Sequence, residues 1–138
     1  MERPRTDANN CFVCGPDNEQ GLQLSFCLEA DDSGKTICVA EFTPAAHMIG
    51  YDDQVHGGIL FSFLDDAMAN YLFLQGKRAH TAKCEIRYRQ PAKVGRTLKA
   101  EGWAVKEKGR LALMEGRITD VLSGEVIAET SASFMISG

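Results

Sequence analysis

The sequence lacks any long uninterrupted hydrophobic run. A helix that crosses a bilayer needs about 20 consecutive apolar residues, and the longest apolar stretch of this chain is broken by Asp65 and Asp66. The first residues, Met-Glu-Arg-Pro-Arg-Thr-Asp, also lack the apolar segment of a secretion signal. These absences favour a cytoplasmic protein with no membrane partner.

Positive charge is scarce as well. The chain has 15 Lys and Arg residues against 19 Asp and Glu residues, a net charge of -4. Nucleic acids attract proteins with a basic face, so no nucleic-acid partner is expected. The sequence contains no internal repeat and no low-complexity segment. Its 138 residues, of which 44% are hydrophobic, predict a single domain over 1–138, in which 1–21 form an N-terminal leader or cover.

The cysteines are too few and too scattered for a disulfide framework. There are five, an odd number, and Cys11 and Cys14 form a lone Cys-x-x-Cys. No second pair follows at the spacing of a zinc ribbon, and no strand-to-helix turn of a redox motif surrounds the first. We therefore expect no metal ion and no cofactor, and we interpret Cys11 and Cys14 as reduced, partly buried thiols.

What the sequence does contain is one long helical segment within Val55–Gly76. A helix of about 18 residues, roughly 27 Å long, is predicted. Two carboxylates, Asp65 and Asp66, fall in its middle, although charged side chains are seldom buried unless they are paired or functional. Apolar residues recur at the three- and four-residue spacing of a helix at Ile59, Leu60, Phe63, Leu64, Ala67, Met68, Tyr71 and Leu72.

The predicted helix opens with His56-Gly57-Gly58. Glycine allows a ligand to approach the backbone closely, and the amide hydrogens of a first helical turn have no helical acceptor. The helix dipole adds partial positive charge at that end. The segment is therefore suited to bind an anion or a polarised carbonyl oxygen.

The remaining segments alternate as strands. They are joined by short turns, which indicates an antiparallel sheet. A helix that is apolar nearly all round needs a sheet that curls about it, with a partner chain over the rest. The predicted strands lie at 22–29, 36–43, 82–89, 96–106, 111–120 and 125–136.

This arrangement resembles the hotdog fold, an α+β fold in which an antiparallel β-sheet wraps around one long central α-helix. The motif Val-His-Gly-Gly-x6-Asp, Val55 to Asp65, resembles the signature of the acyl-CoA thioesterases of the phenylacetate-pathway type. Thr81 to Pro91 is similar to the strand that follows the helix in that branch. The opening Cys-Phe-Val-Cys-Gly-Pro-Asp-Asn, from Cys11, resembles a leader found in a subgroup of the family.

The resemblance implies hydrolysis of an acyl-CoA thioester and assigns roles to residues of the motif. The Gly57 amide would bind the thioester carbonyl oxygen, with Gly58 in support. Asp65 would attack the carbonyl or activate water, and Thr81 would hold that water. Some members carry Asn six residues before the His, where this chain has Gly50. Any such helper group must then come from Gln54 or His56.

The spacing of the motif predicts an oligomer. Gly57 and Asp65 are eight residues apart, or about 12 Å along one helix, whereas reacting groups must lie within roughly 3 to 3.5 Å. One helix therefore cannot place both groups at one carbonyl, but two antiparallel helices can. We expect a homodimer with sites at its interface, or a homotetramer of paired dimers.

Several alternatives stay open at this point. Asp65 could be a structural carboxylate, and Asp66 is interpreted as a structural or interface group. A hotdog enoyl- or hydroxyacyl-thioester hydratase-dehydratase would pair His47 with Asp65, although its His-Phe-Pro-Gly-type segment is absent. A non-catalytic acyl-CoA-binding protein is the other alternative. CoA phosphates require basic side chains, and the candidates are Arg87, Arg89, Lys93, Arg96, Lys106, Lys108 and Arg110.

Overall fold

The computed structural model describes residues 5–137 and shows one helix packed against a six-stranded antiparallel sheet. The fold class predicted from the sequence, two strands followed by one helix and four strands, is confirmed. The elements are β1 (Cys27–Ala30), β2 (Thr36–Phe42), α1 (Gly57–Phe73), β3 (Ala79–Tyr88), β4 (Leu98–Lys108), β5 (Leu111–Asp120) and β6 (Val126–Ile136).

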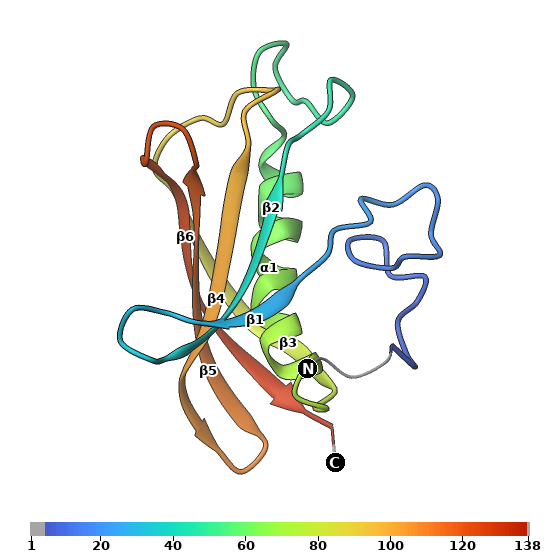
Figure 1. The fold of residues 1–138 in the computed structure, drawn as a ribbon, viewed down its shortest axis with the longest axis vertical. Helices are drawn as coiled ribbons and strands as arrows, with labels where there is room; N and C mark the ends of the chain where they lie inside the picture. Colours follow the sequence, from blue (N-terminus) through green and yellow to red (C-terminus); the bar gives the residue numbers. More distant parts are fainter. Residues whose placement is uncertain (1–4, 138) are drawn as a thin grey trace.

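The strands lie in the order β1-β2-β4-β5-β6-β3, so the strand that follows the helix forms one edge of the sheet. Figure 1 shows α1 against the inner face of this curved sheet, with the N-terminal segment on the other side of the helix. β3 is 10 residues long and mostly exposed. Within residues 5–137 only β6 pairs with it, so the outer edge of β3 carries backbone groups with no partner strand.

The first predicted strand begins later than expected. Leu24 and Phe26 are buried, and Gln23 and Ser25 are exposed, as the alternation predicted. The hydrogen-bonded strand nevertheless starts only at Cys27. Gln23 has a positive φ of 51°, and the amides of Leu22 and Leu24 donate to Phe12 and Val13 of the N-terminal segment. The prediction of a strand from residue 22 was therefore wrong, because alternating burial does not reveal which backbone supplies the hydrogen bonds.

The helix has the ends that the sequence predicted, over 17 residues rather than about 18. His56 is its N-cap residue, and Leu74 is its C-cap residue. Gly76 then adopts a φ of 85°, a conformation that glycine takes without a Cβ clash. The amides of Gly76 and Lys77 donate to the last helical carbonyls, so the exit of the helix is hydrogen-bonded.

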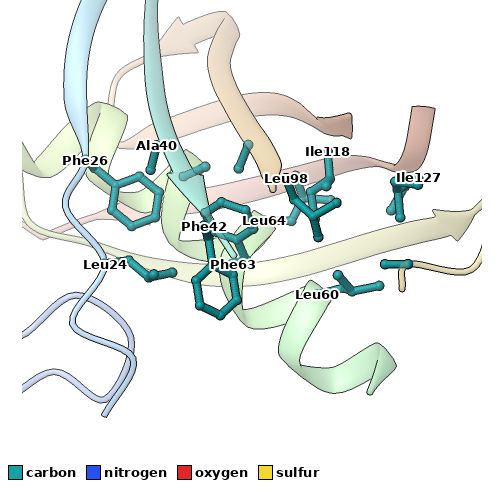
Figure 2. Packing of buried hydrophobic residues seen from close by; sticks show 14 of the residues in the cluster. Leu24, Phe26, Ala40, Phe42, Leu60, Phe63, Leu64, Leu98, Ile118 and Ile127 are labelled. Carbon is teal, nitrogen blue, oxygen red and sulfur yellow. The ribbon is translucent and has the colours of Figure 1, made fainter. Parts of the chain in front are cut away.

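Phe63 lies at the centre of the core between the helix and the sheet. Its side chain is fully buried, and its ring centroid lies 5.3 Å from that of Phe42 and 6.1 Å from that of Phe26. Figure 2 shows these rings together with Leu64 of the helix, and Leu60 further along it. This packing fixes the rotation of α1 about its axis, and so determines where its two carboxylates point.

The N-terminal leader, residues 5–21, covers a second side of the helix; residues 1–4 of the predicted cover lie outside the described residues. Cys11, Val13 and Leu22 pack against the same core as Phe63. The leader turns tightly, since a Cβ on Gly15 would lie 2.3 Å from the Cys11 nitrogen and one on Gly21 2.3 Å from the Phe12 oxygen. Only glycine fits at either position.

A third side of the helix is only partly covered by the sheet and the leader. Phe61 is 36% exposed on this face, and Ser62, Asp65 and Ala69 are partly exposed. These residues recur at the three- and four-residue spacing of one helical face. Among residues 5–137, no helix is long and apolar enough to span a membrane.

Gly102 allows the helix to approach the sheet, and its replacement is expected to cost stability. A Cβ at Gly102 would lie 2.8 Å from the carbonyl carbon and oxygen of Ala67, within the helix backbone. Gly102→Ala should therefore lower the free energy of unfolding by about 1–3 kcal/mol, as overpacking does. Chemical denaturation would measure the change. The matched control is Gly50→Ala, whose Cβ would meet only ordinary contacts at 3.7 Å; equal stability of the two variants would contradict this account.

Candidate active site

The start of α1 is held by His56. Its backbone amide donates to Met48 O at 2.9 Å, and its side-chain Nδ1 accepts from the Gly58 amide at 2.8 Å. Because Nδ1 is an acceptor, the proton of the neutral ring sits on Nε2. His56 thus orients the first turn, and the Gly58 amide is already in use.

The Gly57 amide is a free donor at this helix end. No acceptor for its N–H occurs within residues 5–137, whereas its carbonyl oxygen accepts from Tyr88 Oη at 2.8 Å. The helix dipole places partial positive charge at this amide. The arrangement is suited to stabilise a developing oxyanion.

A cavity of about 470 Å³ opens beside this amide. His56, Gly57 and Leu60 contribute its helical wall, and Tyr88 and Arg89 come from the end of β3 and the residue after it. Gln54, predicted as a substrate-binding residue, lines the same cavity. Of the seven basic residues considered as contacts for CoA phosphates, Arg89 is the one that lines this cavity. It forms an ion pair with Glu129 at 2.7 Å.

Asp65 lies two turns further along the helix, on the partly exposed face beside β3. Its Oδ1 accepts a hydrogen bond from Thr81 Oγ1 at 2.7 Å. Burial raises the pKa of the Asp65 carboxyl, and the Thr81 hydrogen bond lowers it in part. The register of β3 against β6 shifts between Thr81 and Lys83, and such irregularities re-aim side chains. Asp65 and Thr81, predicted separately, therefore come together.

Asp66 points to a different place. Its Oδ2 accepts from Asn70 Nδ2 at 3.0 Å, and its carboxylate is hydrogen-bonded to the Cys14 thiol of the leader. Burial raises the pKa of the Asp66 carboxyl and, with the charge of Asp66, raises the pKa of the Cys14 thiol to about 12. Adjacent residues of a helix are turned by about 100°, so one carboxylate faces β3 and the other the leader.

A second cavity, of about 490 Å³, lies between the leader and the helix start. Phe12 of the leader and Leu22, which follows it, line this cavity with Gly58 and Ile59. His47 lines this cavity and is exposed. Within residues 5–137, His47 makes no hydrogen bond to Asp65, which bonds to Thr81 instead. The pair of His47 and Asp65 that a hydratase would need is therefore not formed.

Tyr88 is the site residue that the sequence did not single out. Its ring would lie 3.4 Å from a Cβ at Gly57, and burial raises the pKa of its hydroxyl. The only signal was its place as the last apolar residue of the alternating strand predicted after the helix. Nothing in the local pattern connects residue 88 to residue 57, because the contact depends on the antiparallel return of β3 along the helix.

Fold and geometry together define a hotdog protein with a free amide at the helix start and a hydrogen-bonded carboxylate within the helix. The model of the thioesterase superfamily matches residues 54–127, more than half of the chain. This chain therefore belongs to the thioesterase superfamily, which confirms the predicted family. No curated protein matches the sequence.

Solved structures share the fold over most of the chain. The E. coli PaaI protein of the phenylacetic acid degradation operon is 22% identical, with a TM-score of 0.74 over 85% of this chain and 81% of PaaI. The smu.793 protein of Streptococcus mutans UA159, solved with acetyl CoA, is 20% identical with a TM-score of 0.72, over 83% and 90%. Zebra fish thioesterase superfamily member 2 is 17% identical with a TM-score of 0.75, over 95% and 94%.

Proposed function

We propose that this protein hydrolyses an acyl-CoA thioester to the free acid and CoA. The observation that carries the proposal is that one helix presents two suitable groups. The free Gly57 amide lies at its start, and the half-buried Asp65 carboxylate lies within it. Membership of the thioesterase superfamily supports the reaction class. A structural neighbour solved with acetyl CoA supports the substrate class.

In the general-base form of the reaction, Asp65 takes a proton from water as the water oxygen attacks the thioester carbon. A C–O bond forms, and the carbonyl electrons move onto oxygen, where the Gly57 amide stabilises the charge. The carbonyl re-forms, the C–S bond breaks, and the CoA sulfur leaves with the electron pair and takes up the proton. In the nucleophilic form, Asp65 displaces the CoA sulfur to give an anhydride, which water then hydrolyses.

The two groups are too far apart to act within one chain. Eight helical residues separate them by about 12 Å along the axis, so the Gly57 amide of one chain must meet Asp65 of a second. The partly exposed face of α1, which carries Phe61 and Asp65, and the unpaired outer edge of β3 support this pairing. A second copy packed antiparallel would cover the helix and extend the sheet, and pairs of such dimers could form a tetramer.

Within this site His56 orients the first turn through its bond to Gly58. Gly58 contributes mainly its lack of a side chain, since its amide is occupied. Gln54 lies on the cavity wall, where its amide group is suited to bind a polar group of the substrate. Position 50 is Gly rather than Asn, so the helper group that Asn supplies in some members of the family must come from Gln54 or His56.

Thr81→Val is expected to lower kcat roughly tenfold or more, with little change in KM. The substitution removes the hydroxyl that bonds to Asp65, and a hydrogen bond to a charged group contributes about 1.5–3 kcal/mol. Steady-state kinetics with an acyl-CoA substrate would measure it. Thr81→Ser, which keeps the hydroxyl, should retain most of the rate; equal losses in both variants would contradict a role for the hydrogen bond.

The proposal is tested by following release of the CoA thiol from a panel of acyl-CoAs of different chain length and aromatic character. Turnover of at least one substrate is expected. Binding of acyl-CoAs without any thiol release would favour the non-catalytic acyl-CoA-binding alternative. Loss of enoyl-CoA absorbance without thiol release would favour the hydratase alternative.

A further inference from the structure

A second cluster of reactive side chains lies where the leader meets the helix. Cys11 and Cys14 come from the leader and Asp66 from α1, and their ligand atoms all lie within 4.8 Å of one another. Cys14 is buried, and Cys11 and Asp66 are half-buried. The thioester chemistry proposed above uses none of the three.

The leader backbone is shaped to present both sulfurs on one side. The Gly15 amide donates to Cys11 O at 2.8 Å, which closes a tight turn over the Cys-x-x-Cys segment. A Cβ at position 15 would lie 2.3 Å from the Cys11 nitrogen, so this turn requires the glycine that directly follows Cys14. The turn then continues through a bond from the Asp17 amide to Asn9 O at 2.9 Å.

Neighbouring side chains orient two of the three groups, Asp66 and Cys14. Asn70 Nδ2 donates both to the Asp66 carboxylate at 3.0 Å and to the Asp66 carbonyl at 2.9 Å, which fixes the direction of the carboxylate. Arg5 Nη2 donates to Cys14 Sγ at 3.1 Å. Arg5 Nε is buried with no acceptor within residues 5–137. A buried Nε–H without an acceptor, on a cation that already donates to the Cys14 sulfur, suits a site with more negative charge on sulfur.

We propose that Cys11, Cys14 and Asp66 bind one thiophilic divalent cation, with Zn²⁺ as the best fit. Two thiolates and one carboxylate match the ligands zinc prefers, at about 2.3 Å for sulfur and 2.0–2.2 Å for oxygen. Tetrahedral coordination at those lengths separates two ligand sulfurs by roughly 3.8 Å, within the 4.8 Å limit of the cluster. Water would occupy the fourth position.

The charges of this site balance when the cation is bound. Two thiolates and one carboxylate carry three negative charges, which one divalent cation and the Arg5 guanidinium neutralise together. Hard cations such as Mg²⁺ and Ca²⁺ prefer oxygen ligands and do not suit a site with two sulfurs. Asn70 acts as the outer partner that orients a ligating carboxylate, as such partners do in metal sites.

The cation would tie the leader to the helix. Phe12, which stands between the two cysteines, lines the cavity next to the helix start together with Ile59. Fixing Cys11 and Cys14 on Asp66 therefore fixes one wall of that cavity. The site was not predictable from cysteine spacing alone, because its third ligand lies 52 residues after Cys14 in the sequence.

The experiment is metal analysis of the full chain, purified without chelator, followed by titration of the chelator-treated protein with Zn²⁺ and with Co²⁺. We expect one equivalent of zinc per chain and, with Co²⁺, the charge-transfer absorption of a thiolate-bound ion. Alkylation should modify two more thiols after chelation than before. Cys14→Ser and Asp66→Asn should each lower the affinity for Zn²⁺ at least about tenfold, whereas Cys27→Ser, a cysteine on β1, should not.

A folded wild-type protein that takes up neither zinc nor cobalt in stoichiometric amount would overturn the proposal. Cys11 and Cys14 would then hold the leader only through their packing against the core and their hydrogen bonds. A mass lower by two hydrogens in the untreated protein, showing a Cys11–Cys14 disulfide, would overturn it too. Unchanged zinc affinity in Asp66→Asn would show that Asp66 is not a ligand, which would contradict the proposed three-residue site. The wild-type titration decides the matter even where a cysteine variant fails to fold.

Discussion

Asp65→Asn is expected to lower kcat for acyl-CoA hydrolysis by about a hundredfold or more. The substitution removes the group that takes the proton from water or attacks the carbonyl, and a lost acid-base group typically costs 10²–10⁴-fold. An asparagine has nearly the same shape, and its side-chain oxygen can still accept from Thr81. The change therefore removes chemistry without removing the contact to β3.

Stability distinguishes a functional Asp65 from a structural one. Burial raises the pKa of this carboxyl, so at neutral pH the folded state carries the cost of a partly desolvated charge that the unfolded state does not. Replacing that charge by a neutral amide should leave the melting temperature unchanged or raise it. The matched control is Asp32→Asn, in the exposed turn between β1 and β2, which should change neither property. A lower melting temperature with unchanged turnover in Asp65→Asn would contradict the assignment.

Gly57→Pro is expected to lower kcat by about 10²–10³-fold, the range for loss of one oxyanion donor. Proline removes the amide N–H of the first helical residue and adds a ring, whose Cβ the alanine control described below reproduces. Proline is well tolerated at that position, because the N–H has no helical acceptor and the required φ suits a helix. The residue before a proline must be extended, and His56 already has φ -59° and ψ 132°.

Gly57→Ala is the control for this variant, since it adds a Cβ but keeps the N–H. That Cβ would contact the Tyr88 ring at 3.4 Å, which is an ordinary contact distance. Steady-state thiol release should therefore fall much further in Gly57→Pro than in Gly57→Ala. If the two variants lost activity equally, the steric effect at Tyr88 would explain the loss and the oxyanion role would be wrong.

Sequence patterns predicted the fold well where one face of an element is buried. The three- and four-residue spacing of Leu60, Phe63 and Leu64 located the helix, and alternation located five of the six strands closely. The pattern failed at residues 22–26, where burial alternates but the backbone bonds to the leader. Periodicity reports which side chains are buried, and a leader can bury them as well as a sheet.

The candidate site was predictable to the extent that it lies on one continuous segment. Gly57 and Asp65 share the helix, and the resemblance brought in Thr81, which the structure places against Asp65. The contacts between residues far apart in the sequence were not predictable. Tyr88 meets Gly57, and Cys14 meets Asp66, only because β3 and the leader fold back onto the helix.

The measurement that tests the central claim most directly is thiol release by mixed dimers of Asp65→Asn and Gly57→Pro chains. If each site takes its Gly57 amide from one chain and its Asp65 from the other, a heterodimer contains one intact site and one doubly impaired site. A random equal mixture should then recover about a quarter of wild-type activity. Half of its dimers are mixed, and in each mixed dimer one of the two sites is intact. Activity of the mixture no higher than that of either variant alone, in dimers shown to have exchanged chains, would contradict a site shared between two copies.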